Sequence, residues 1–190
     1  MNGLTTRALE RRVARTLGTL RLVGVAFEAA AMGWRWDWYA TPAHLVVPVV
    51  SGCWGVVFGV LCLRRGLGGR LGRRLTAGEL VVGLLTAGGI VWAVPPDELA
   101  AGPNWVLLRL VGTSLTVVWC ARWTVWVPAT LLLIGTEATA VQLAAEAPAA
   151  PAQTACYAAV MTGVAAVFAV TGRFLRSGAA RADAWLERAG

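Results

Sequence analysis

The sequence predicts an all-α, polytopic membrane helix bundle with six transmembrane helices and a further C-terminal helix on the cytoplasmic side. Three observations lead to this prediction: composition, the lengths of the apolar segments, and the positions of the arginines. Hydrophobic residues make up 57% of the 190 residues and charged residues 14%, whereas a soluble domain has about 25% charged residues. A soluble domain of this size has no way to bury so much apolar surface. The composition therefore excludes a soluble enzyme, a disordered chain and a disulfide-stapled secreted domain.

Six segments approach the roughly 20 mainly apolar residues that a spanning helix needs. They are residues 16–34, 43–63, 75–94, 104–120, 124–145 and 153–172. The second is the clearest, because residues 45–63 contain no charge. The fourth and fifth come from one nearly continuous apolar stretch, residues 105–136, which is too long for a single span. We divide that stretch at the Cys120–Trp123 turn.

The arginines predict the orientation of the spans. All 17 basic residues are arginine, and short cytoplasmic loops carry the excess of basic residues in membrane proteins. One side of the predicted bundle holds 14 of them, at positions 7, 11, 12, 15, 64, 65, 70, 73, 74, 122, 173, 176, 181 and 188. The gaps on the other side hold only Arg35, together with Asp37, Asp97, Glu98 and Glu146. We therefore expect a multi-pass protein of the cell (cytoplasmic) membrane with both termini in the cytoplasm.

This topology divides the chain into three parts. Residues 1–15 form a basic cytoplasmic segment, residues 16–172 the six-helix transmembrane domain, and residues 173–190 a cytoplasmic juxtamembrane helix of the signalling type. A competing interpretation is a cleaved signal peptide ending near Ala29 and Ala31. The apolar core of such a peptide would be very short, and Glu28 would lie at its boundary. The aromatic cluster at residues 34–39 fits an interfacial belt, with an aromatic ligand cage as the alternative.

Five ionisable residues lie within the predicted spans: Arg21, Glu28, Glu79, Arg109 and Glu137. Each is costly in a bilayer, so such residues usually face the bundle interior and pair with one another. Their depths predict that Arg21 pairs with Glu79, and that Arg109 pairs with Glu28 or Glu137. We interpret them as a buried charge network, which serves as an interhelical clamp, a signal-sensing or proton-linked site, or part of an ion pathway.

Small residues lie on the same helix faces as some of these charges, and they also form a pattern of their own in the second segment. Arg109 shares a helical stripe with Gly112, Thr113 and Thr116. In the second segment, Ser51, Gly55 and Gly59 repeat at four-residue spacing, a pattern typical of close helix contact in membranes. We expect them to pack within the bundle, with dimerisation as the alternative.

No motif predicts catalysis, a metal site or a cofactor. The only histidine, His44, has no second ligand at metal-binding spacing, and the four cysteines are isolated within or at the ends of apolar runs. The glycine-rich stretch 66–72 lacks the lysine of a phosphate-binding loop, and we expect it to be a flexible, basic cytoplasmic loop. The arginines are not gathered on one solvated face beside groove-binding helices, so we expect no nucleic-acid partner and no enzymatic activity.

The C-terminal tail carries the pattern most informative about function. Leu175, Ala179, Ala182 and Leu186 follow heptad spacing, and we expect a helix from Arg173 to about Arg188 that continues the sixth span. The spacing indicates a signalling-helix seam that contacts a second copy or a cytoplasmic partner. A solvated helix lying on the membrane surface is the alternative.

The compact six-span arrangement and the exit sequence resemble a known family. The exit sequence reads Arg-Phe-Leu-Arg at residues 173–176 and Ala-Arg-Ala-Asp-Ala-Trp-Leu-Glu-Arg-Ala at residues 180–189. This combination resembles the N-terminal membrane sensor region of actinobacterial-type (MacS-like) sensor histidine kinases. In that family the exit helix leads into a dimerisation helix with the phospho-accepting histidine, followed by an ATP-binding domain. This chain departs from the pattern, because its only histidine is His44 and it stops at Gly190, so no kinase residue is carried over.

The resemblance implies an integral membrane sensor or transmission module of a two-component system, without kinase activity of its own. Its partners would be the lipid bilayer, a second copy of the chain, or a cytoplasmic kinase or response regulator reached through the C-terminal helix. The alternative is a small transporter or permease-like protein that uses the buried Arg and Glu residues. A scaffolding role is the third hypothesis.

Overall fold

The computed structural model describes the chain except for residues 1–2, 40, 97, 100–104, 145–149 and 190. Its described elements are all helical: α1 (Leu4–Trp34), η1 (Trp36–Tyr39), α2 (Pro42–Arg65), α3 (Gly69–Gly88), α4 (Ile90–Ala93), α5 (Trp105–Cys120), α6 (Trp123–Ala144) and α7 (Ala150–Ala189). The all-α prediction is confirmed. Five of the six predicted segments each lie largely within one long helix, and the third, residues 75–94, is divided between α3 and α4. Asp97 and Glu146, two of the acids assigned to the second side, lie outside the described residues.

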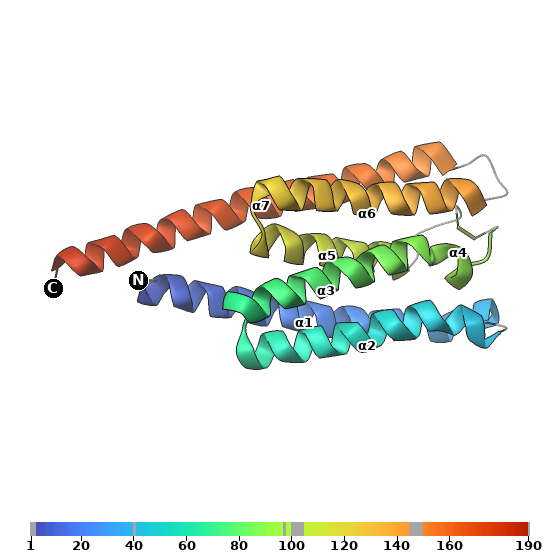
Figure 1. The fold of residues 1–190 in the computed structure, drawn as a ribbon, viewed down its shortest axis with the longest axis horizontal. Helices are drawn as coiled ribbons and strands as arrows, with labels where there is room; N and C mark the ends of the chain where they lie inside the picture. The colour runs from blue at the N-terminus through green and yellow to red at the C-terminus, as the bar shows by residue number, and fades with distance from the viewer. Residues whose placement is uncertain (1–2, 40, 97, 100–104, 145–149, 190) are drawn as a thin grey trace.

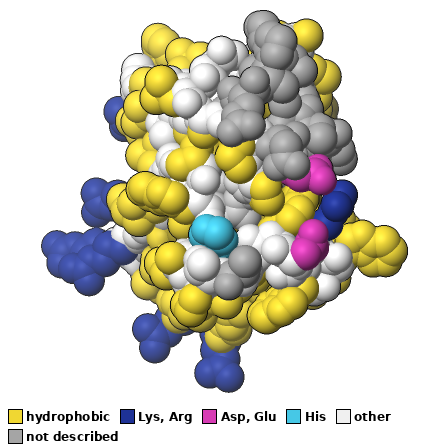
Figure 2. All heavy atoms as spheres, turned by 90° about the vertical axis from the view of Figure 1, so that its right-hand side faces the viewer, with side chains coloured by type: hydrophobic (Ala, Val, Ile, Leu, Met, Phe, Trp, Pro, Cys, Tyr) yellow, Lys and Arg dark blue, Asp and Glu magenta, His cyan; other side chains and the backbone are white. Residues whose placement is uncertain are grey.

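The six long helices run along the length of the bundle in alternating directions (Figure 1). Both termini lie at the same end, together with the α2–α3 and α5–α6 turns. We call this end the arginine end, because 14 of the 17 arginines belong to its turns and terminal helix segments. Figure 2 looks onto the opposite end, where a small group of acidic and basic side chains lies among hydrophobic residues. There Arg35 lies 3.6 Å from Glu98 and over the ring of Trp38.

Helices α1 and α3 begin earlier in the sequence than the predicted segments, because they include arginine-rich residues that the prediction placed outside the spans. The basic N-terminal segment is helical from Leu4 onward. The stretch expected to be a flexible loop is helical from Gly69, so only residues 66–68 connect α2 to α3. Gly66 has a φ of 73°, a left-handed conformation that favours glycine, and its N–H bonds to the carbonyl of Cys62 to end α2.

The third predicted segment is divided into α3 and α4 at Gly89. A Cβ atom at this position would lie 2.7 Å from a methyl group of Val47, which is closer than packed side chains approach one another. The glycine therefore lets the chain turn beside α2.

Two apolar clusters form the interior. The larger joins α3, α4, α5, α6 and α7 around residues such as Ile90, Val106 and Leu133. The smaller joins α2 and α3 at Phe58, Cys62 and Leu75. The charged residues Glu79 of α3 and Arg109 of α5 are fully buried in this interior and are not in contact with water.

The outer surface of the bundle is also apolar. Large hydrophobic side chains are exposed on all six long helices, among them Phe27 on α1, Leu85 on α3 and Leu132 on α6. An apolar exterior of this extent is typical of a surface that contacts lipid rather than water.

Three helices are long and apolar enough to cross a membrane: α2, α6 and the part of α7 at Thr154–Arg188. Helix α5 is apolar but has only 16 described residues. The mean hydropathy of α1 and α3 is lower than that of the other long helices, because both carry arginines near their starts and charged residues in their interiors. The length and composition of these three described helices therefore support a membrane protein.

Helix α7 continues without a break through the predicted tail. Its 40 residues correspond to about 60 Å at 1.5 Å per residue, about twice the hydrocarbon thickness of a bilayer. The second half extends beyond the other helices at the arginine end, alongside the start of α1 (Figure 1).

Candidate functional site: a buried charge cluster

Glu79 on α3 is the centre of a buried group of charged and polar side chains. Trp54 of α2 donates its indole N–H to Oε2 of Glu79 at 2.7 Å, and Thr113 of α5 donates its hydroxyl to Oε1 at 3.1 Å. Nη2 of Arg21, from α1, lies 3.2 Å from Oε1, and Nη2 of Arg109, from α5, lies 3.3 Å from Oε2. One fully buried carboxylate therefore holds four helices together.

Glu28 adds a second acid from α1. It lies seven residues after Arg21, on the same face of the helix, and its Oε1 is 3.7 Å from Nη1 of Arg21. The cluster of Arg21, Glu28, Glu79 and Arg109 is formally neutral, because it contains two arginines and two glutamates. Neutrality matters here, since an unpaired charge in a low-dielectric interior is strongly unfavourable.

Several polar atoms of the cluster have no hydrogen-bond partner among the described residues. They are Nε and Nη2 of Arg21, Nε and Nη1 of Arg109, and both carboxylate oxygens of Glu28. Glu28 is thus held less firmly than Glu79, by one ion pair and no hydrogen bond. A buried acid held in this way can change its charge or its partner with less rearrangement than the central Glu79.

Two glycines make room for the guanidinium groups. A Cβ atom at Gly55 of α2 would lie 3.4 Å from Nε of Arg21 and 3.5 Å from Nη1 of Arg109. A Cβ atom at Gly112 of α5 would lie 3.2 Å from Nη1 of Arg21. An apolar cavity of about 140 Å³ between α1 and α5 also reaches Arg21.

The predicted small-residue face of α2 lies within the bundle. Gly59 packs against α1, where a Cβ atom would be 3.0 Å from the carbonyl oxygen of Gly18 and 2.7 Å from Leu22. Ser51 is fully buried, and Gly55 faces Val25 of α1. Gly55 and Gly59 therefore line the contact between α1 and α2, and Ser51 lies in the interior rather than on an open surface.

The ion pairs agree in part with those predicted from depth. Arg21 does lie beside Glu79. Arg109, expected beside Glu28 or Glu137, instead contacts Glu79, because α3 and α5 pack side by side and one carboxylate reaches both arginines. Glu137 on α6 is buried, and no cation of the described chain lies within ion-pair distance of it. The structure therefore brings together four of the five predicted residues.

A second polar contact joins the two ends of the chain at the arginine end. Helix α1 begins after Gly3, which offers no side-chain cap. Asp183 of α7 caps the helix instead: Oδ1 accepts the N–H of Thr5 at 2.9 Å, and Oδ2 accepts the hydroxyl of Thr6 at 2.7 Å and its N–H at 3.1 Å. The Thr6 hydroxyl, together with the amide hydrogen bonds, lowers the pKa of Asp183 to about 2. A side chain at Gly3 would overlap the Asp183 carboxylate.

Three of the four predicted seam residues face α1. Leu175, Ala179 and Ala182 line a groove of about 430 Å³ whose other wall is the start of α1. Ala179 is buried there. Leu186 is outside the groove and 62% exposed. Part of the heptad pattern is thus used within the chain, and Leu186 remains available to another molecule.

Sequence reasoning missed two residues of these sites. Trp54 lies in the most apolar span, where its indole N–H must find an acceptor, and that requirement was the available signal. Asp183 has no local signal, because its partners are about 177 residues away in sequence. Thr113 was placed on the Arg109 stripe, and the structure adds its hydrogen bond to Glu79.

No protein-family model, curated protein or solved structure shows a significant match to this chain.

Proposed function

We propose that the chain crosses the cell membrane six times with both termini in the cytoplasm. The apolar surfaces of all six long helices support this topology, as does the location of 14 arginines at the end that holds both termini. The buried neutral cluster lets α1, α3 and α5 carry charges within the bilayer without exposing them to lipid.

We further propose that the protein is a membrane sensor or transmission module. The observation that carries this proposal is the position of α1, which connects two polar sites. One face of α1 holds Arg21 and Glu28 in the buried cluster, while its first turn is capped by Asp183 of α7. A change in the charge or position of Glu28 therefore acts on a helix whose other end contacts the cytoplasmic extension of α7.

The resemblance to the membrane region of MacS-like sensor kinases supports the same proposal, because such a region must pass movement through its exit helix. An uninterrupted α7 is suited to that role, since a continuous helix transmits rotation or sliding over its whole length. The signal would pass to a second copy or to a cytoplasmic kinase or response regulator.

Reporter fusions test the topology. A reporter that is active only in the cytoplasm should be active after Arg74 and after Gly190, and inactive after Glu98. Activity after Glu98, or its absence after Arg74, would contradict six spans.

Fusion to a histidine-kinase catalytic region tests transmission. The region is joined after Gly190 with zero to seven added helical residues, and autophosphorylation is measured for each length. A transmitting helix should give activity that rises and falls with a period of about 3.5 residues, and Glu28→Gln should change the activity of the active lengths. A flat length dependence together with no effect of Glu28→Gln would contradict the proposal. Glu10→Gln, an exposed acid on the same helix, is the matched control.

A transporter is the second candidate function. The observation that favours it is the set of guanidinium and carboxylate atoms without hydrogen-bond partners among the described residues, beside the cavity that reaches Arg21. Transport would not require the exit helix, so removal of residues 179–190 should leave it intact and abolish transmission. That deletion therefore separates the two functions.

A further inference from the structure

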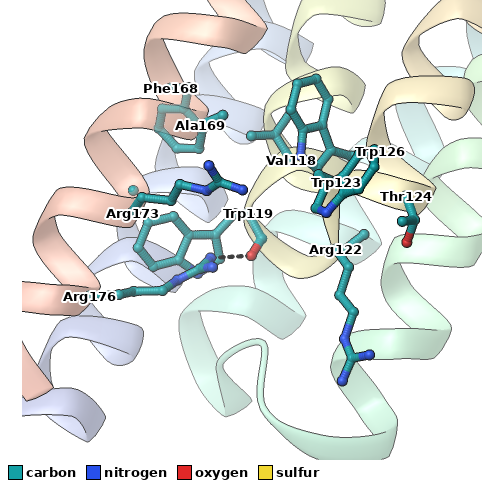
Figure 3. Close-up of a pocket in the computed structure, with 12 residues that line it drawn as sticks. Val118, Trp119, Arg122, Trp123, Thr124, Trp126, Phe168, Ala169, Arg173 and Arg176 are labelled. Atoms are coloured by element: carbon teal, nitrogen blue, oxygen red, sulfur yellow. Dashed lines mark hydrogen bonds between the residues drawn. The ribbon is translucent and has the colours of Figure 1, made fainter.

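A cavity of about 350 Å³ lies at the arginine end, between the α5–α6 turn and α7 (Figure 3). Aromatic and basic side chains dominate its lining: Trp119, Trp123, Trp126, Arg122, Arg173 and Arg176. None of the described lining residues is acidic. The cavity is therefore electropositive and rimmed by indole rings.

The three arginines are engaged to different degrees. Arg176 lies over the ring of Trp119, 4.2 Å from its centroid, and donates a hydrogen bond to the Trp119 carbonyl. Arg173 extends from α7 into the space between Trp119 and Trp123, whereas Arg122 extends from the turn away from the tryptophans (Figure 3). The side chains of Arg122 and Arg173 have no ion pair or hydrogen bond among the described residues. Arg173 thus presents unused donors to the cavity.

The start of α6 adds to the positive potential. This 22-residue helix begins at Trp123, and Thr124 in its first turn lines the cavity. The N-terminus of a helix carries the positive end of the helix dipole and favours anions. Arginine side chains and the helix start therefore converge on one space.

We propose that this cavity binds the phosphate group of an anionic phospholipid from the cytoplasmic leaflet. Guanidinium groups match phosphate oxygens in geometry and charge. Tryptophan settles at the headgroup level of a bilayer, and basic pockets between membrane helices on the cytoplasmic side suit anionic headgroups. The inference rests on the topology proposed above, which places the arginine end at the inner surface. A bound lipid joins the α5–α6 turn to α7, the helix through which the signal leaves.

The experiment uses the purified full-length chain in detergent, titrated with dioctanoyl phosphatidylglycerol while the Tm is recorded. A ligand that binds only the folded protein raises the Tm in a saturable way. Dioctanoyl phosphatidylcholine and inorganic phosphate are titrated in parallel. We expect a saturable rise with phosphatidylglycerol and a much smaller one with either comparison compound.

Arg173→Gln is the diagnostic variant, because Arg173 is exposed and no described residue pairs with it, so its loss leaves the fold intact. It should raise the apparent Kd for phosphatidylglycerol about tenfold, the effect of one charge-assisted hydrogen bond. Arg122→Gln should have a smaller effect. Arg64→Gln is the matched control, an exposed arginine at the same end but outside the cavity, and it should change the Kd less than twofold.

Three outcomes would overturn the proposal. Equal weakening by Arg64→Gln and Arg173→Gln would mean that diffuse surface charge attracts the lipid. Equal stabilisation by phosphatidylcholine would remove the role of the negative charge, and equal stabilisation by inorganic phosphate would remove the role of the lipid. Each of these leaves the topology standing if the reporter after Arg74 remains active, so failure of the lipid site and failure of the topology are distinguishable.

Discussion

At the scale of single residues, the molecule concentrates its buried polarity on one carboxylate. Glu79 accepts contacts from Trp54, Thr113 and two arginines, so its negative charge is compensated from several directions. Removing one arginine leaves the other partners in place but leaves the cluster with two glutamates and one arginine. The cost of such a change depends on burial, because water is not available to replace the lost partner.

Arg109→Ala should lower the free energy of unfolding by about 3–5 kcal/mol, the usual cost of breaking a buried ion pair. Arg109→Lys should recover only part of this loss, since an ammonium group does not reproduce the guanidinium fork. Thermal and denaturant unfolding in detergent measure the effect.

Arg35→Ala is the control for this measurement. Arg35 also pairs with an acid, Glu98, but its side chain is 46% exposed, and exposed pairs contribute about 1 kcal/mol or less. Equal losses for Arg35→Ala and Arg109→Ala would show that burial does not distinguish the two pairs, against the arrangement described here.

At the scale of helices, two contacts determine how α1 is held. Its middle packs closely on α2 through Gly18 and Gly59, and its first turn is capped by Asp183 of α7. The first contact is steric and the second is electrostatic. The α1–α2 contact should therefore respond to a change in side-chain volume, and the Asp183 cap to a change in pH.

Gly59→Ala should destabilise the protein by about 1–3 kcal/mol, because the added methyl group collides with Leu22 and the Gly18 carbonyl. Gly52→Ala, on the same helix, meets no atom within 4 Å and should stabilise by up to about 1 kcal/mol through helix propensity. Measurements of the free energy of unfolding in detergent, made on both variants, test the expected loss for Gly59→Ala and the expected gain for Gly52→Ala. A stabilising Gly59→Ala would contradict the close α1–α2 contact.

The Asp183 cap should be pH-dependent only in acid. Hydrogen bonds from Thr6 and Thr5 lower the pKa of Asp183 from 3.8 to about 2, so the carboxylate stabilises the contact above its unfolded pKa. That stabilisation falls as the pH drops below about 4 and is lost as the pH passes through about 2. Hydrogen exchange in the first turn of α1, corrected for the intrinsic effect of pH, should show protection at pH 5 that fades over this range.

Asp183→Asn is the comparison for this measurement. It should expose the first turn at neutral pH and remove the acid dependence, because an amide does not titrate. If hydrogen-exchange protection of the first turn of α1 were already lost near pH 6 in the unaltered protein, a group other than Asp183 would control the contact.

At the scale of the whole molecule, the extension of α7 has two sides. Leu175, Ala179 and Ala182 face α1, while Leu186 faces away and is 62% exposed. The heptad pattern therefore serves the fold of one chain over most of its length. The proposed contact with a second copy or a partner is therefore expected at the last turns of α7, where Leu186 is exposed.

Cysteine cross-linking tests that division. In a variant without the native cysteines, a cysteine at Leu186 should cross-link two copies, or the chain to its partner, far better than one at Arg181 or Asp183. A cysteine at Ala182 should instead pair with one at Ala8 within a single chain, because both line the groove. Equal cross-linking between copies at Arg181, Asp183 and Leu186 would contradict a specific contact surface at Leu186.

The sequence by itself determined the long helices, their approximate bounds and the identity of the charges buried within the predicted spans. These features depend on local quantities: the length of an apolar run, the position of arginines, and the cost of placing a charge within such a run. The continuous helix through residues 173–188 was predictable from another local pattern, the heptad spacing of the tail. The division at Gly89 was not, because it depends on the approach of Val47 from another helix.

Only the tertiary structure decided which charges meet. Depth placed Arg109 nearer Glu28 and Glu137, yet the packing of α3 against α5 puts Glu79 within reach of both arginines. The same holds for Asp183, which caps a helix at the other end of the sequence. A pairing between distant residues depends on how helices pack around one another, and hydrophobic periodicity determines which face of a helix is buried but not which neighbour covers it.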